Sequence, residues 1–157
     1  MGSLRSSAFS LAGGFALLSL IVSAGGCASQ SGRQNLEDGK RAYLSGHKSD
    51  AELIWLESLA DAEAFGEDDP RLTQSLRMLA NLQIQEQRYA EAKPLLERWM
   101  DIKERRGEVD DPAFADGVDA LAGIHMVQGD FNGAAALFER SVHVRENDGM
   151  IDNIELS

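Results

Sequence analysis

The chain has 157 residues, enough for one domain, and carries 26 acidic against 15 basic residues, for a formal net charge of −11. Such an acidic surface repels nucleic acid phosphates, so DNA or RNA binding is excluded as its main role. Good helix formers dominate, β-branched residues are scarce, and only 3 prolines occur. These features predict an all-α fold.

The first 26 residues are predicted to be a secretory signal peptide. Arg5 precedes an apolar run from Phe9 to Ala24, whose core is shorter than the about 20 apolar residues of a spanning helix. Small residues end this run, and Cys27, the single cysteine, follows directly. The pattern resembles the lipobox of bacterial lipoproteins, in which the cysteine is acylated and becomes the new first residue. Ala24 departs from the leucine usual there.

This resemblance implies a lipid anchor on Cys27, followed by a polar tether over residues 27–34. Ala28, rather than aspartate, follows the cysteine, and by similarity to enteric lipoprotein sorting this favours the outer membrane facing the periplasm. Two other interpretations remain open. "MGSLRS" fits the pattern for amino-terminal myristoylation, and the apolar run could be an uncleaved anchor with a structural cysteine.

An internal repeat of 42 residues organises the rest of the chain. "DPRLTQSLRMLANLQIQEQRYAEAKPLLERWMDIKERRG", from Asp69, returns as "DPAFADGVDALAGIHMVQGDFNGAAALFERSVHVRENDG", from Asp111. A weaker copy precedes them at a shift of 41, which aligns Ala51 with Ala92. The predicted repeats are therefore about 35–66, 69–107 and 111–149, in a domain of 35–147 before a C-terminal tail of 148–157.

Each repeat is predicted to be a pair of helices. Asp69 and Asp111 are good N-caps, with proline at the first helical position. Apolar residues then follow at three-and-four spacing, with turns at 87–88 and 129–130. Small residues are expected where paired helices cross closely, with Tyr89 and Phe131 filling the space beside them. The repeated positions that carry this pattern are Gly39, Ala51, Leu79, Ala80, Tyr89, Ala92, Leu121, Ala122, Phe131 and Ala134.

The motif "LANL…YAEAKPLLER" resembles the tetratricopeptide repeat (TPR), in the 42-residue version typified by kinesin light chain. The resemblance implies a right-handed superhelix of about three stacked antiparallel helix pairs. The aromatic residue usual after "LAxL" is replaced by Gln83 and His125. HEAT-type repeats have a similar period, but they lack this pattern of small residues and stay a minor alternative.

The resemblance also implies that a protein or peptide partner binds the concave face lined by the first helices. Arg77 and Asn81 are four residues apart, so both are expected to point the same way and, with Lys40, to bind a carboxylate. Leu36, which aligns with Arg77, is expected on this side too. The alternative is an ordinary solvated helix face. The residues predicted to line the concave face are Lys40, Tyr43, Arg77, Asn81, Ile84, Asp116, Asp119 and Met126.

No pattern in the sequence nominates an enzyme, a metal site or a cofactor. The 3 histidines stand in different predicted elements without acids or cysteine at ligand spacing, and no HExxH, GxSxG or phosphate-binding loop occurs. Trp55 and Trp99 are most simply core residues.

The predicted function is therefore a lipid-anchored scaffold of the bacterial cell envelope that helps to localise or assemble a protein complex. An accessory lipoprotein that recruits a cell-wall or other envelope hydrolase is the main alternative, and a hydrolase using acidic residues a weaker one. At the C-terminal edge, Met150, Ile151 and Ile154 cover the last groove, or the edge meets another protein, such as a second copy in a homodimer.

Overall fold

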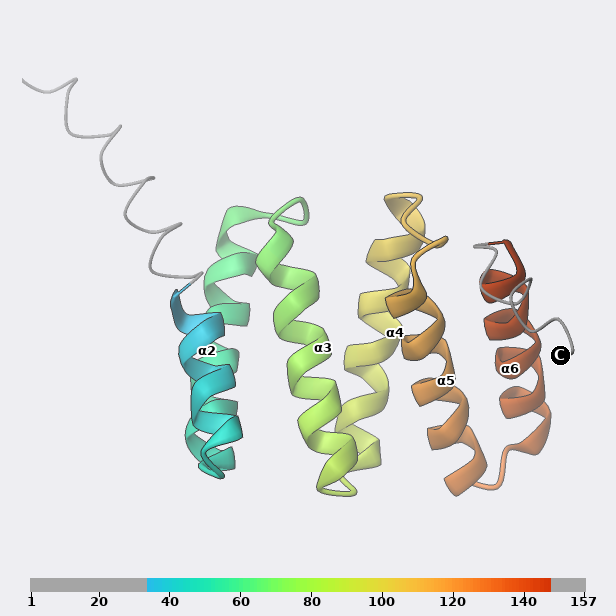
Figure 1. The fold of residues 1–157 in the computed structure, drawn as a ribbon, viewed down its shortest axis with the longest axis horizontal. Coiled ribbons are helices and arrows are strands. Elements are labelled where there is room, and N and C mark those ends of the chain that lie inside the picture. Colours follow the sequence, from blue (N-terminus) through green and yellow to red (C-terminus); the bar gives the residue numbers. More distant parts are fainter. Residues whose placement is uncertain (1–33, 148–157) are drawn as a thin grey trace, which may run out of the picture.

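The computed structural model describes residues 34–147 as a row of antiparallel helices (Figure 1). A first helical segment, 34–44, precedes α2 (Lys48–Phe65). The following helices are α3 (Pro70–Gln85), α4 (Tyr89–Arg105), α5 (Pro112–Val127) and α6 (Phe131–Asn147). No strand lies within residues 34–147, and the predicted all-α fold is confirmed.

The helix boundaries follow from caps that recur in each repeat. The side chain of Asp69 accepts a hydrogen bond from the Arg71 backbone N–H at 2.9 Å, and Asp111 accepts one from Ala113 at the same distance. Proline occupies the first helical position in both α3 and α5. These bonds satisfy amide groups that have no partner inside the helix.

The turns within the three helix pairs share one geometry. Gly46, Gln87 and Gly129 have φ angles of 83°, 59° and 79°, in the left-handed region. In each turn the next residue donates its N–H to a carbonyl five residues earlier, as Arg88 does to Gln83 at 2.7 Å. This is the helix-ending bond of the Schellman motif, which requires a left-handed residue.

The small residues of the repeats lie in the core. Ala51, Ala80, Ala92, Ala122 and Ala134 are all buried. This close approach of helices lets each pair cover the apolar face of the next.

Two glycines show how tightly the helices approach. A Cβ added to Gly39 would overlap the indole of Trp55, and one added to Gly117 would overlap that of Trp99. Both tryptophans are almost fully buried, so each broad ring occupies the space that the glycine leaves. Sequence reasoning did not single out Gly117.

The expectation for Phe131 was wrong. Tyr89 is half-buried and packs against the core, but Phe131, its counterpart one repeat later, is largely exposed. The difference has a physical cause: α4 is followed by the pair α5 and α6, whereas no helix follows α6 within residues 34–147. An aromatic side chain at this position needs the next pair to cover it.

Successive second helices are joined by a repeated ion pair. Arg98 on α4 pairs with Glu63 on α2, and Arg140 on α6 pairs with Glu104 on α4 at 2.7 Å. Arg98 and Arg140 are equivalent in the 42-residue repeat, and Glu63 and Glu104 are equivalent at the shift of 41. These pairs are exposed and contribute little each, but they are consistent with the register of neighbouring repeats.

Candidate functional site

The first helices of the pairs, segment 34–44, α3 and α5, present a continuous series of solvent-facing residues, here termed the first-helix surface. Exposed or half-buried side chains recur on it in each repeat, from Lys40 through Asn81 to Met126. The sequence-predicted partner-binding residues all lie on these three helical segments. These residues fall into three groups: those at a cavity beside segment 34–44, Arg77 at a second cavity, and the residues of the third repeat.

Lys40, Tyr43 and Asn81 come together at a cavity of about 220 Å³ between segment 34–44 and α3. The Tyr43 hydroxyl donates a hydrogen bond to the side-chain oxygen of Gln85, and its ring lies 5.8 Å from that of Trp55. The complete lining is Lys40, Tyr43, Leu44, Trp55, Met78, Asn81, Leu82 and Gln85. An apolar floor with a cation and amides at its edge suits a side chain of a peptide ligand.

The floor of this cavity rests on Trp55, which sequence reasoning assigned only to the core. Trp55 is buried and donates its indole N–H to the Leu36 carbonyl at 3.3 Å. The predicted surface position of Leu36 was wrong, because its side chain is buried in the core. The only sequence signal for this arrangement was the glycine at position 39, which leaves room for the indole.

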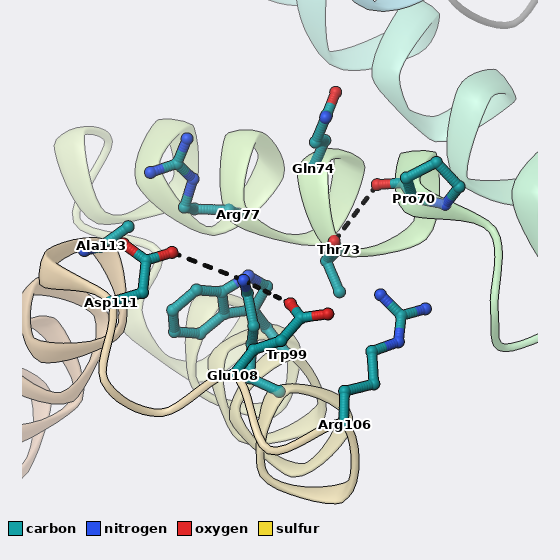
Figure 2. Close-up of a pocket in the computed structure, with 10 residues that line it drawn as sticks. Pro70, Thr73, Gln74, Arg77, Trp99, Arg106, Glu108, Asp111 and Ala113 are labelled. Carbon is teal, nitrogen blue, oxygen red and sulfur yellow. Dashed lines mark hydrogen bonds and ion pairs between the residues drawn. The ribbon is translucent and has the colours of Figure 1, made fainter.

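Arg77 lies at a different cavity, of about 320 Å³, between α3, α4 and the start of α5 (Figure 2). Figure 2 shows the Arg77 and Gln74 side chains projecting from α3 away from Trp99 and Arg106. Within residues 34–147, the Arg77 guanidinium makes no hydrogen bond or ion pair. It is therefore a cation available to a ligand.

A second cation at this cavity is already neutralised. The Lys103 ammonium lies 2.7 Å from a Glu108 carboxylate oxygen and 3.6 Å from one of Asp111. The hydrogen bond from Lys103 lowers the pKa of Glu108 from its usual value. Arg106, on the same wall, donates to the Glu67 carbonyl. Arg77 thus supplies a cation that has neither a hydrogen bond nor an ion pair among the described residues.

The expected single clamp of Lys40, Arg77 and Asn81 is therefore not formed, since Arg77 and Asn81 line separate cavities. The reason lies in the helix period. Residues four apart differ by about 40° around an α-helix, and Arg77 lines the cavity beside α4 and α5 while Asn81 and Gln85 line the one beside segment 34–44. The three side chains form a line across the surface.

Asp116 and Asp119 are engaged within the chain. Arg145 on α6 lies 3.1 Å from the Asp116 carboxylate and 2.7 Å from that of Asp119. The hydrogen bond to Asp119, followed by the contact with Asp116, raises the pKa of the Arg145 guanidinium. Ile84 packs partly against the core, while Met126 is half exposed. In the third repeat, the first-helix surface therefore presents the apolar Met126 and two carboxylates that are already paired with Arg145.

Across residues 34–147, histidine, cysteine and acidic side chains do not gather into a group that could bind a metal ion. In the same described part, no helix has the length and apolarity needed to cross a bilayer. Cys27, predicted to carry lipid, and the predicted signal peptide and most of the tether lie outside the described residues.

Comparison with solved structures identifies the fold. The chain is similar to a crystal structure of nearly identical TPR-like repeats from Podosopora anserina, a protein described as a kinesin light chain. The TM-score is 0.62 at 22% identity, with 76% of this chain and 56% of that chain covered. The match therefore spans little more than half of the other chain's length. No protein-family model and no curated protein matches the sequence.

The TPR-like fold predicted from the sequence is confirmed by this comparison. The fold by itself does not fix a function, which depends on the residues of the site.

Proposed function

We propose that this TPR-like chain is a non-catalytic, lipid-anchored scaffold of the bacterial cell envelope. It binds a helix or extended segment of a protein partner on the first-helix surface and helps to localise or assemble an envelope complex. The observation that carries this proposal is the line from Lys40 through Asn81 to Arg77, with an apolar cavity at one end and an unpaired guanidinium at the other.

The chemistry of this line favours a particular ligand. The cavity next to Tyr43 and Trp55 accepts an apolar side chain, while the free charge of Arg77 attracts a carboxylate. A partner segment that carries both an apolar residue and an acidic residue fits the two sites. A chain with a net charge of −11 has few such sites for an acidic ligand, so the position of Arg77 gives the surface selectivity.

Photo-crosslinking in the native host tests this binding mode. A benzophenone side chain replacing Asn81 should cross-link to a discrete partner, and the added Arg77→Glu substitution should reduce that product at least about tenfold, since it replaces attraction by repulsion. Arg105→Glu is the matched control, because Arg105 is exposed on α4 and away from both cavities. Equal cross-linking with Arg77→Glu and unchanged helicity would refute binding at this surface.

The anchor is tested separately by mass spectrometry of the mature amino terminus. We expect Cys27 to be the first residue and to carry acyl chains, and Cys27→Ser to release the chain from the membrane fraction. Unmodified Cys27 in the native host would contradict anchoring but leave partner binding unaffected.

A further inference from the structure

The last helix exposes an apolar face that has no partner within residues 34–147. Phe131, Ala135, Phe138 and Val142 recur on α6 at spacings of four, three and four residues, so they lie along one side of the helix. Phe131 is 68% exposed, Phe138 38% and Val142 47%. These four residues are here termed the α6 stripe.

The α6 stripe matches a buried face of the preceding repeats. Phe138 is equivalent to Leu96 on α4 and to Trp55 on α2, which are only 1% and 2% exposed. Val142 is equivalent to Met100, which is 5% exposed. The positions are therefore helix-packing positions, and they are open in α6 because the next helix is missing from the described part of the chain.

The segment that covers the end of α4 is known from the structure. Phe114, at the start of α5, is fully buried, its ring 5.8 Å from that of Trp99 and beneath the Arg140 guanidinium. Val109, in the connection before α5, also packs against the core. Residues 106–115 thus dock two apolar side chains on the preceding repeat.

Residues 148–157 repeat this segment in sequence. At the same shift of 42, "RRGEVDDPAFA" from Arg105 aligns with "NDGMIDNIELS" from Asn147. Ile151 stands at the place of Val109, and Leu156 at the place of Phe114. Glycine and aspartate recur at positions 149 and 152, and Asn153, another good N-cap, replaces Asp111.

The ion pairs of the last repeat also differ from those of the preceding one. Lys103 finds its acidic partners in the connection, at Glu108 and Asp111. Its equivalent, Arg145, is paired instead with Asp116 and Asp119 on α5. The equivalents of Glu108 and Asp111 are the uncharged Met150 and Asn153. Because Arg145 is already neutralised, an apolar segment can cover it without leaving a buried charge unpaired.

We propose that residues 148–157 dock on the α6 stripe in this repeat register, as the beginning of a fourth repeat. Leu156 packs over Val142 beside Ser141, the equivalent of the Trp99 that Phe114 contacts in the preceding repeat, and Ile151 takes the place of Val109. Ile154 stays exposed, because its equivalent, Pro112, is exposed. This inference is independent of the proposed function, since it concerns the edge of the array and not the first-helix surface.

Thiol labelling of the full chain in detergent tests the proposal. Val142→Cys in a Cys27→Ser background gives a single thiol under the proposed contact, and Glu139→Cys in the same background gives the rate for an exposed thiol. We expect the thiol at position 142 to react at least about tenfold more slowly than that at 139. Adding Leu156→Asp should abolish this protection, whereas the equally drastic Ile154→Asp should preserve it.

Three results would each overturn the proposal. A freely reactive thiol at position 142 would show that nothing covers the stripe. Protection unaffected by Leu156→Asp would show that another segment covers it. Protection that increases with protein concentration would identify a second copy as the occupant. Circular dichroism of each variant distinguishes loss of docking from loss of folding, because Val142 and Glu139 are exposed in the described array.

Discussion

Side-chain size is balanced between residues that are distant in sequence. Position 99 carries a tryptophan and faces Gly117, whereas its equivalent one repeat earlier, Ser58, faces no large group and instead accepts a hydrogen bond from Ser75 at 3.1 Å. Gly117 and Ser75 are themselves equivalent. A broad ring opposite a glycine, or two small hydroxyls opposite each other, fills the space between neighbouring helices.

Among residues 34–147, Gln87 is the only residue other than glycine that has a positive φ angle. Its φ of 59° is a strained conformation for a residue with a Cβ, and its side chain is exposed. Gln87→Gly should therefore raise the free energy of unfolding by about 0.5–1 kcal/mol. Thermal unfolding should show a midpoint about 2–4 °C higher.

The equivalent glycine supplies the control for this prediction. Gly129 has a φ of 79°, so Gly129→Gln should destabilise by a similar amount, and Gln87→Ala should give no gain because alanine keeps the Cβ. If Gln87→Gly left stability unchanged or lowered it, the strain assigned to this turn would be absent.

At the scale of the element, the corner between α2 and α3 is held by a largely buried ion pair. The Arg71 guanidinium donates to both carboxylate oxygens of Asp69, at 3.0 Å and 2.6 Å, and lies 4.9 Å from the centre of the Phe65 ring. The hydrogen bonds from the Arg71 side chain are the main reason why the pKa of Asp69 is below its usual value. The same carboxylate caps α3, so one group fixes both the helix start and the corner.

This lowered pKa predicts a pH dependence of stability. The ionised Asp69 stabilises the folded state above its unfolded-state pKa, about 3.8, and this contribution is lost as the pH falls through the lower folded-state pKa. Asp69→Asn keeps an N-cap but removes the charge, so it should cost about 1–2 kcal/mol at pH 7. The difference between the two proteins should shrink below about pH 4.

Denaturant unfolding of both proteins between about pH 7 and about pH 2.5 measures this difference. Asp111→Asn is the matched control, since Asp111 caps α5 in the same way, but Ala113 stands at the place of Arg71 and the ion pair of Asp111 with Lys103 is longer, at 3.6 Å, and more exposed. We expect Asp111→Asn to lower the free energy of unfolding by less than Asp69→Asn does. A loss for Asp69→Asn that stayed constant across the pH range would mean that the charge is not responsible.

For the whole molecule, stability comes from stacking helix pairs that cannot bury their apolar faces alone. Each pair is covered by its successor, and the Glu63–Arg98 and Glu104–Arg140 ion pairs join successive second helices. The array is open at α6, where the stripe from Phe131 to Val142 is unpartnered within residues 34–147. The α6 end of the array therefore differs from its interior in the apolar surface that it exposes.

The sequence by itself determined the helices, their caps and the period, because these depend on residues within a few positions of each other. Asp69 and Asp111 before proline, the glycines of the turns and the small residues at the crossings all carried a local signal. Tertiary structure alone decided that Arg77 and Asn81 serve different cavities, that Leu36 is buried and that Phe131 is exposed. Each of these outcomes depends on which distant helix packs against the residue. The residues next to it in the chain do not determine that packing.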